Sequence, residues 1–481
     1  MSKSLLANKL SARLLPIAGA LILVGCSTLA PDYSRSELAE EKALDESLQL
    51  QYQAEQYSGV SSQQANQVPW QSFIQDSRLT QVIELALNNN RSLRQTLADV
   101  EAARATYGIQ KAELYPNINL GLGGSRSKTS SGNISTVYTA DASLSGYEID
   151  LFGKLRSLNT VQMEAYLATE DTAKAAQIAL IGEIADAWLT LAADSNQLSL
   201  ARATQANAQK TLDITLKRLE LGVDSRIDLA SAETVFYGAN SDIAVYTTQV
   251  SQDLNALRLL VGEQLDSSLL PDSLPDAAEL VADVPAGLSS SVLLQRPDVL
   301  AAEHQLKSAN ANIGAARAAF FPSLSLTATG GLASAVLADI FTGGASSIWT
   351  IAPSLTLPIF DGGANEANLA YSQAQQTKYL ASYEYAIQNA FAEVADALAR
   401  RATIQAQLNA EQALVIAATR SYELSLARYK GGVDSFQNAL TAQRILYQAQ
   451  QSLILTKQVD LANRISLYRV LGGGITENGA I

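Results

Sequence analysis

The sequence is poor in the residues that build disulfides and metal centres. It has one cysteine, one histidine and two methionines among 481 residues. A single cysteine cannot form a disulfide within the chain, and a single histidine argues against a Cys/His metal site. That histidine, His304, lies in a helical segment, where we expect it to face solvent or a neighbouring side chain.

Catalytic motifs are also missing. Catalysis needs a positioned acid, base, nucleophile or metal, and the chain shows no such group of residues. The glycines within 121–124 lie inside a strand pattern and not in a phosphate-binding loop before a helix. The sequence therefore predicts a protein that is not an enzyme, has no cofactor and has no energy source of its own.

Basic residues are outnumbered by acidic ones, 34 to 47, which gives a net charge of −13. Nucleic-acid binding needs a basic surface, so we expect no nucleic-acid partner. Charged residues amount to 17% and aromatic residues to 6%, whereas hydrophobic residues make up 47%. These fractions are typical of long packed helices with small residues at their contacts.

Beyond the N-terminus, no apolar run reaches the ~18–20 residues of a membrane-spanning helix. The best candidate, 175–193, is interrupted by Glu183 and Asp186. Only helices and closed barrels satisfy all their backbone groups in lipid. If the mature chain crosses a membrane, it must therefore do so with β-strands.

Residues 1–25 have the pattern of a signal peptide. Three basic residues precede an apolar segment at 14–24, and Gly25 precedes Cys26. This ending resembles the bacterial lipobox, in which the cysteine becomes the mature N-terminus and carries N-acyl and S-diacylglycerol chains. Ser27 after the cysteine resembles outer-membrane sorting. The alternative is a free buried thiol that happens to follow a signal sequence.

The remaining chain contains an internal repeat with an offset of 206–210 residues. Four segments recur in the same order, which indicates two copies of one structural unit. The matching pairs are 115–120 with 321–326, 149–152 with 357–360, 183–187 with 393–397, and 222–225 with 432–435. Each copy reads as helix, two strands, long helix, turn and helix.

The long helices are predicted from an absence of proline. None occurs between Phe152 and Gly222 or between Phe360 and Gly432, and apolar residues recur there at intervals of three and four, as in a coiled coil. About 68 helical residues at ~1.5 Å per residue extend about 100 Å. We therefore expect long antiparallel helices and not a compact domain.

Two strands are predicted in each copy, from segments rich in Ser, Thr and Gly with rough alternation. They are 117–125, 136–151, 323–333 and 347–360, with hairpin loops at 127–135 and 342–346. Four strands cannot close a barrel, and lipid does not tolerate an open sheet edge. The chain must therefore oligomerise, and three copies would supply twelve strands, a number consistent with closure. The predicted fold is an α+β membrane protein, a tandem repeat with four β-strands and long antiparallel α-helices in each chain.

The repeat also predicts how the chain is divided. The segments are a signal peptide (1–25), a lipid-anchored connector (26–78), a first repeat (79–262), a linker (263–290), a second repeat (291–471) and a C-terminal tail (472–481).

Several motifs point to one family. The most specific are Gln295-Arg296-Pro297-Asp298, Ala319-Phe320-Phe321-Pro322, Pro358-Ile359-Phe360-Asp361 and Glu393-Val394-Ala395-Asp396-Ala397. They resemble the TolC-like outer-membrane factor family, in the lipoprotein (NodT-type) branch that serves resistance-nodulation-division efflux pumps. The resemblance covers essentially the whole mature chain. It implies a homotrimer in outer-membrane lipid, whose strands form a 12-stranded barrel and whose helices form a periplasmic tunnel. It also implies docking to a periplasmic membrane-fusion adaptor and an inner-membrane transporter.

The turns between the long helices and their partners are the candidate functional site. Gly222, Gly431 and Gly432 allow the chain to reverse, and Asp224 and Asp434 can cap the helices that follow. In a trimer each acid would also recur three times around a narrow tip. Rings of carboxylates select cations and, paired with basic residues, can hold a constriction shut.

The family resemblance implies that the closed entrance lies at this tip, held by bonds among a tyrosine, a basic residue and aspartates. By motif position, Tyr429 and Lys430 are such partners. The family has a further aspartate in a Leu-Asp-Ala-Gln-Arg run, where this chain has Thr441. Asp228 and Asp434 could compensate for it.

These observations predict a passive outer-membrane channel subunit of a tripartite efflux pump for drugs or other small molecules. The alternatives are a duct for type I protein secretion or for metal ions and, from another class, a periplasmic coiled-coil scaffold without a pore. Metal export often uses Met or His clusters, which the chain lacks. A scaffold would not need strand pairs at matching places in both repeats.

Overall fold

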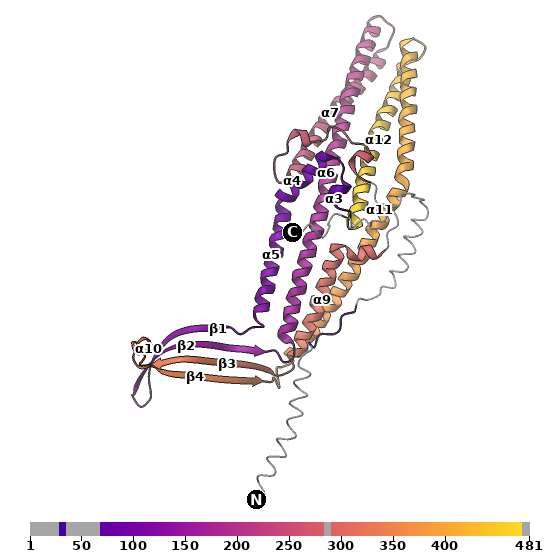
Figure 1. The fold of residues 1–481 in the computed structure, drawn as a ribbon. Helices are drawn as coiled ribbons and strands as arrows, with labels where there is room; N and C mark the ends of the chain where they lie inside the picture. Colours follow the sequence, from indigo (N-terminus) through magenta and orange to yellow (C-terminus); the bar gives the residue numbers. More distant parts are fainter. Residues whose placement is uncertain (1–27, 35–67, 283–289, 474–481) are drawn as a thin grey trace. The chain divides into compact units, whose positions relative to one another are not determined.

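The computed structural model describes residues 28–34, 68–282 and 290–473. Its elements run in the order α3 (Trp70–Phe73), α4 (Ser77–Asn89), α5 (Arg91–Ala112), β1 (Ile118–Lys128), β2 (Ile134–Ile149), α6 (Lys154–Glu220), α7 (Arg226–Val261), η2 (Ser267–Leu269), α8 (Ala277–Leu280), η3 (Ser290–Gln295), α9 (Pro297–Ala318), β3 (Ser323–Ser334), α10 (Asp339–Thr342), β4 (Ser346–Thr356), α11 (Ala364–Lys430) and α12 (Phe436–Val470) (Figure 1). The predicted signal peptide and Cys26 lie outside the described residues.

The two halves of the chain contain matching elements in the same order. α5 and α9 each have 22 residues, α6 and α11 each have 67, and α7 and α12 have 36 and 35. This confirms the predicted tandem repeat of helix, two strands, long helix, turn and helix. At ~1.5 Å per residue, each long helix extends about 100 Å.

The chain forms two compact units, and each takes residues from both repeats. The first includes Asp99–Glu170 and Ala301–Glu384, and the second includes Asp171–Leu300 and Tyr385–Ile481. The strands belong to the first unit, and both helix turns belong to the second.

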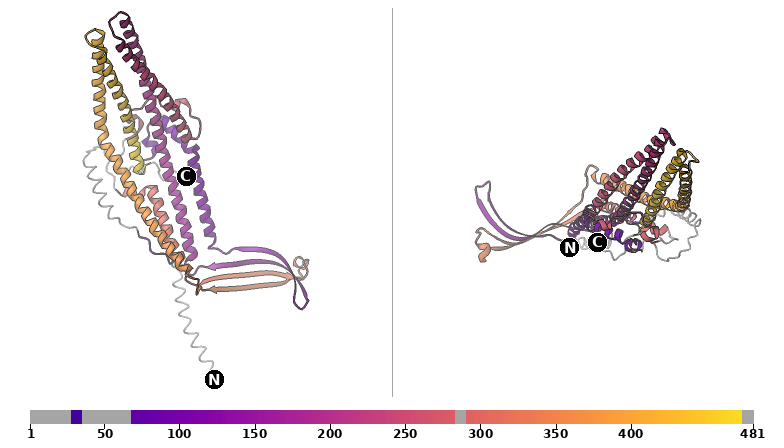
Figure 2. Two further views of the ribbon diagram at one scale, coloured as in Figure 1. Left: turned by 180° about the vertical axis from the view of Figure 1, so that it is seen from behind. Right: turned by 90° about the horizontal axis from the view of Figure 1, so that it is seen from above.

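The first unit contains a four-stranded antiparallel sheet in the order β1-β2-β3-β4. Seen from above in Figure 2, the strands form one twisted layer. β2 and β3 come from different repeats and pair from Tyr138 with Ser334 to Ile149 with Leu324, so the repeats join inside the sheet. β1 and β4 are the edge strands, each with one neighbour.

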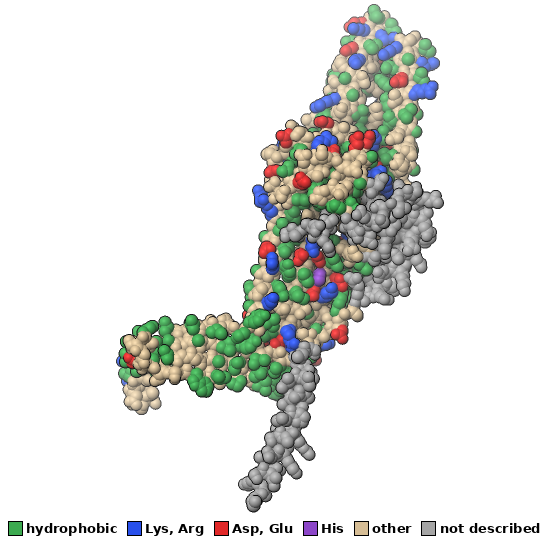
Figure 3. Space-filling model, viewed as in Figure 1, with side chains coloured by type: hydrophobic (Ala, Val, Ile, Leu, Met, Phe, Trp, Pro, Cys, Tyr) green, Lys and Arg blue, Asp and Glu red, His purple; other side chains and the backbone are tan. Residues whose placement is uncertain are grey.

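Large apolar side chains are exposed on the two edge strands. Leu120 on β1 is 87% exposed and Trp349 on β4 is 76% exposed, and Figure 3 shows apolar side chains spread over the visible surface of the sheet. Water disfavours such a surface. Strands of 11 to 16 residues with apolar side chains pointing outward are suited to a lipid bilayer.

The predicted strands are present, with differences at their ends. β4 ends at Thr356 and not at Phe360, because Thr356 pairs with Ser323, the first residue of β3, and no partner continues beyond it. Pro358 also lacks an N–H for a ladder. The connection from β3 to β4, residues 335–345, includes the short helix α10, where a loop alone was expected.

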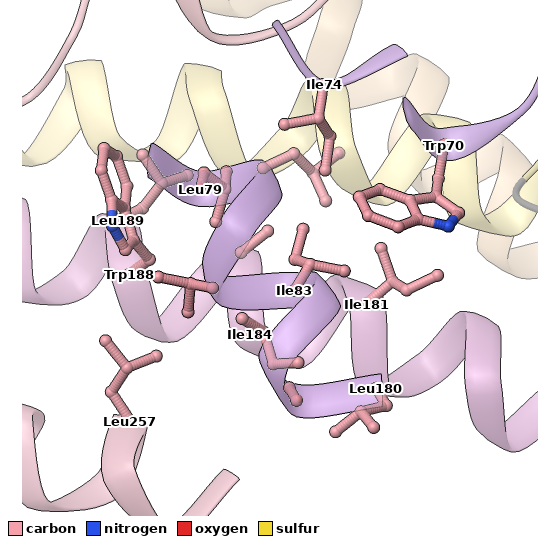
Figure 4. Packing of buried hydrophobic residues seen from close by; sticks show 14 of the residues in the cluster. Trp70, Ile74, Leu79, Ile83, Leu180, Ile181, Ile184, Trp188, Leu189 and Leu257 are labelled. Atoms are coloured by element: carbon pink, nitrogen blue, oxygen red, sulfur yellow. The ribbon is translucent and has the colours of Figure 1, made fainter. Parts of the chain in front are cut away.

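The second unit has an apolar core where α6 passes α3, α4 and α7. Trp70, Ile184, Trp188 and Leu257 are each at most 4% exposed (Figure 4). α6 also contains a window that could cross a membrane by length and composition, but 56% of that window is buried inside the protein. More than half of that window therefore contributes to packing within the chain.

α6 and α7 also bring two carboxyl groups together. Burial, a hydrogen bond shared with Asp194 and the charge of Asp194 raise the pKa of Asp253 to about 6. The second repeat has Ile404 and Asn463 at the equivalent positions, and the Asn463 side-chain amide donates to a backbone carbonyl at 3.0 Å. At this place the first repeat thus has two carboxyl groups that can change charge, whereas the second repeat has only uncharged side chains.

This pair predicts a pH dependence of stability. Between its ordinary value of 3.8 and about 6, Asp253 binds a proton in the folded state and not in the unfolded state, so the free energy of unfolding falls as the pH rises. Melting temperatures at about pH 5 and about pH 7.5 should differ less for Asp253→Asn than for the parent. Asp396→Asn, at an exposed position on α11, is the control. Equal differences for Asp253→Asn and the parent would contradict the prediction.

Candidate functional site at the helix turns

Each long helix is followed by the sequence Gly-Val-Asp-Ser, at which the chain reverses its direction. Gly222 and Gly432 adopt φ values of 75° and 71°. The amides that follow, Val223 and Val433, donate to carbonyls in the last helical turn at 2.8 and 3.0 Å. A left-handed residue that redirects amides in this way is a common helix C-cap. Ser225 and Ser435 then precede the first residues of α7 and α12.

Asp224 lies at the centre of a cluster that joins the two repeats. Its carboxylate accepts a hydrogen bond from the hydroxyl of Tyr429, and Arg218 Nε donates to both carboxylate oxygens at 3.1 Å. The Arg218 guanidinium also lies over the Tyr429 ring, 4.8 Å from its centroid. The hydroxyls of Tyr429 and Thr215 are 3.2 Å apart. The Asp224 side chain is only 6% exposed, so water competes little for these bonds.

Apolar side chains enclose the tyrosine of this cluster. Phe436 packs with its ring centroid 5.1 Å from that of Tyr429, and Ala232, Ala439 and Leu440 complete the buried group. Burial raises the pKa of Tyr429, and the hydrogen bond to Asp224 raises it further. The phenol therefore stays protonated and remains a donor to the carboxylate, an arrangement stronger than a neutral hydrogen bond.

The second turn is more open. Asp434 accepts from Arg428 Nε at 2.9 Å and from the Asn438 amide at 3.0 Å, and the hydrogen bond from Arg428 lowers the pKa of Asp434. The Arg428 side chain is 57% exposed. Leu219 occupies the position equivalent to Tyr429 in the first repeat and has no hydroxyl to donate. The two turns have the same sequence, but their aspartates accept hydrogen bonds from different partners.

The other predicted residues have local contacts within the chain. Asp228 accepts from the Ser225 amide at 3.0 Å, and its own amide donates to Ser225 Oγ at 3.2 Å, which forms a capping box at the start of α7. Thr441 donates to a carbonyl of its own helix at 2.9 Å. Lys430 is exposed, and its pairing with an aspartate of another subunit stays a prediction.

Sequence reasoning assigned no role to Arg218, Arg428 or Thr215. A signal for the two arginines was present in the repeat, because each stands six residues before the turn aspartate. Thr215 left no comparable signal, since its partner is distant in the sequence. In the first unit, His304 Nδ1 lies 2.6 Å from a carboxylate oxygen of Glu164, so it faces a neighbouring side chain.

Comparisons with known proteins place the chain in a family. The model of the family described as "Outer membrane efflux protein" matches residues 82–263 and 288–473. A "Probable efflux pump outer membrane protein TtgC" of Pseudomonas putida is 40% identical over 481 residues, covering 98% of this chain and 96% of the relative. "Outer membrane protein OprJ" of Pseudomonas aeruginosa is 38% identical over 476 residues, covering 96% of each chain.

Solved structures agree with this assignment. The open state of the Neisseria gonorrhoeae MtrE outer membrane channel matches with a TM-score of 0.81 and 35% identity, covering 93% of this chain and 98% of that chain. A membrane protein from Pseudomonas aeruginosa matches with a TM-score of 0.84 and 37% identity, with the same coverage of both chains.

The fold combines two strand pairs that expose apolar side chains with two long helical hairpins. These are the features of an outer-membrane channel subunit. The chain belongs to the outer membrane efflux protein family. It is a channel subunit of an efflux pump in the outer membrane, which is inconsistent with a scaffold that forms no pore.

The two neighbouring glycines of the second turn predict opposite outcomes. Alanine at Gly432 would be strained at φ 71°, by roughly 1–2 kcal/mol. Alanine at Gly431 would meet only ordinary contacts at 3.4 Å or more. We expect Gly432→Ala, but not Gly431→Ala, to accelerate hydrogen exchange of the amides in residues 433–438. Equal exchange in both variants would show that the left-handed conformation is not required.

Proposed function

We propose that three copies of this chain close a twelve-stranded barrel in the outer membrane and extend it with a helical tunnel. The tunnel passively conducts molecules that a periplasmic membrane-fusion adaptor and an inner-membrane transporter of the resistance-nodulation-division class deliver. The two unpaired sheet edges support this arrangement, since in lipid they require strands from neighbouring copies. The division into signal peptide, connector, two repeats, linker and tail belongs to the same proposal.

Small apolar molecules are the proposed cargo. Relatives that are 40% identical include a "Toluene efflux pump outer membrane protein TtgC" and an "Antibiotic efflux pump outer membrane protein ArpC". These names favour organic solvents and antibiotics over secreted proteins or metal ions. Among the described residues, no group of three or more His, Cys, Asp or Glu side chains could hold a metal ion.

The cluster of Asp224, Tyr429 and Arg218 is the proposed gate, and its geometry is the observation that carries this assignment. It ties the turn of the first repeat to the long helix of the second, with little exposure to water. An opening that separates the hairpins must break these bonds. Asp228, Lys430 and Asp434 lie at the same tip, where we propose that they contribute charge around the entrance.

Removing the tyrosine hydroxyl should open the channel. A hydrogen bond to a charged group contributes about 1.5–3 kcal/mol, and ~1.4 kcal/mol changes an open–closed ratio tenfold. Tyr429→Phe should therefore raise the open probability of single channels in planar bilayers roughly tenfold or more. Asp434→Asn should have a smaller effect, because its arginine partner is exposed.

Tyr385→Phe is the matched control for Tyr429→Phe. It removes the same hydroxyl from the same helix at a position that is 69% exposed. Cells carrying Tyr429→Phe should also admit vancomycin more readily than cells carrying the control. If both variants conduct and leak like the parent, the cluster only packs the hairpins and does not gate the channel.

A lipid anchor at Cys26 is proposed from the lipobox. The mass of the intact protein extracted from membranes should correspond to residues 26–481 plus acyl chains. Cys26→Ala should lose that lipid mass and reduce correct assembly without necessarily abolishing transport, since the barrel also anchors the protein. A mature protein that starts elsewhere and carries no lipid would exclude the anchor.

A further inference from the structure

The four strands carry only four charged side chains, and the two signs lie on opposite faces of the sheet. Arg126 and Lys128 are on β1, and Asp141 and Glu148 are on β2. Side chains alternate between the faces along a strand, and paired residues of neighbouring strands share a face. Asp141 pairs with Gly121, which is an odd number of positions from both cations. Glu148 shares the face of Asp141, because their partners on β3 are six positions apart.

The two cations lie on the apolar face of the sheet. The opposite face carries the two acids among mostly Ser, Thr and Gly, as expected for the inside of a channel. The apolar face is defined by the large side chains that share it according to the pairing of the strands: Ile118, Leu120, Leu122, Leu144, Leu332, Trp349, Ile351 and Leu355.

The cations stand at the end of β1 that is remote from the helices. The chain enters β1 from α5 at Ile118 and leaves it at Lys128 for the hairpin turn at 129–133 (Figure 1). Ten steps of ~3.4 Å give about 34 Å along the strand. A tilt of ~40° reduces this to about 26 Å of depth, close to the ~25 Å apolar band of an outer-membrane barrel. With the helices in the periplasm, the cations lie at the level of the outer-leaflet headgroups.

An aromatic residue marks the same boundary. Tyr138 pairs with Gly124, two residues before Arg126 on the same face. A Cβ at Gly124 would come within 3.0 Å of the Tyr138 ring, so the ring lies across the glycine. Aromatic side chains form girdles where a barrel leaves the apolar part of the bilayer. The order along this face is therefore apolar, aromatic and then basic.

The chain provides no counter-charge for these cations. Both are exposed, and among the described residues neither forms an ion pair or a side-chain hydrogen bond. β4, which the proposed barrel places beside β1 of the next copy, contains no charged residue. The remaining source of negative charge at this level is the lipid itself. Arginine binds phosphate through its planar fork, and lysine does so as a point charge.

We propose that Arg126 and Lys128 bind phosphate groups of the outer-leaflet glycolipid, lipopolysaccharide, whose acyl chains pack on the apolar face beneath them. This assignment rests on the proposed barrel and adds a lipid site to its outer rim. Each basic residue near an anionic lipid surface strengthens binding about fivefold, so two contribute roughly 25-fold. Basic residues on an edge strand can also simply prevent aggregation, and in that role they would show no preference for a phosphorylated lipid.

Native mass spectrometry of the full-length protein in mild detergent, titrated with purified bisphosphorylated lipid A, tests the site. Arg126→Gln combined with Lys128→Gln should weaken binding to the trimer roughly 25-fold. The matched control is Lys210→Gln combined with Arg420→Gln, which removes the same charge from exposed positions on α6 and α11. The control should bind lipid A like the parent. Equal binding by the strand variant and the parent would overturn the site.

A second arm moves the charges to the other face of β1 at the same level. Arg126→Ser and Lys128→Ser combined with Ser125→Arg and Ser127→Lys keep the net charge, and this variant should bind lipid A as weakly as the neutral one. Binding like the parent would show that total charge alone attracts the lipid and would overturn the site.

Two further ligands separate lipid phosphate from other sources of affinity. Lipid A without its phosphates should bind the parent as weakly as bisphosphorylated lipid A binds the neutral variant. Millimolar inorganic phosphate should not displace lipid A, because it has no acyl chains for the apolar face. Equal binding of the dephosphorylated lipid, or displacement by phosphate alone, would overturn the proposal. A parent protein that forms no trimers would instead overturn the proposed barrel.

Discussion

The unpaired outer edges of β1 and β4 are the constraint on which the architecture depends. Each edge presents backbone donors and acceptors, and in lipid every unsatisfied group costs several kcal/mol. Within the described residues both edges are left uncovered, because the four strands there form one open layer. Closure must come from other copies, and the apolar side chains on the same strands make the membrane the place where it occurs. A requirement on backbone hydrogen bonds thus makes the channel depend on more than one chain.

The tandem repeat meets this requirement with one kind of chain. The two repeats of that chain are similar but not identical. Two copies of one unit give hairpins of nearly equal size, so neighbouring repeats can meet in the same way within and between chains. A few residues differ between the repeats, so equivalent positions make different contacts. Tyr429 faces the first turn, whereas Leu219 occupies the equivalent place, and Asp253 titrates where Asn463 cannot. The two repeats are thus alike in size but differ in the contacts that hold their turns and helices.

Much of this could be predicted from the sequence, because its signals are local or repeated. Uninterrupted helical periodicity predicted α6 and α11 almost to the residue, and alternation predicted the strands. The end of β4 could not be predicted, since it depends on where β3 begins and not on its own residues. The contact of Asp224 with Tyr429 likewise joins residues 205 apart, so only the folded chain shows which aspartate the tyrosine meets. The lipobox is the opposite case, a motif confined to residues 1–27, outside those that the structure describes.

The equal length of α6 and α11, 67 residues each, constrains how this sequence can evolve. Asp224 meets Tyr429 because both helices bring their ends to the same level. Inserting one heptad into α6 alone would lengthen it by about 10 Å and carry Asp224 beyond the reach of the phenol. The same insertion in both helices, matched by one in α7 and one in α12, would keep the two ends level and the packed faces aligned. Insertions and deletions in the hairpins should therefore be inherited as pairs, one in each repeat, and in multiples of seven residues.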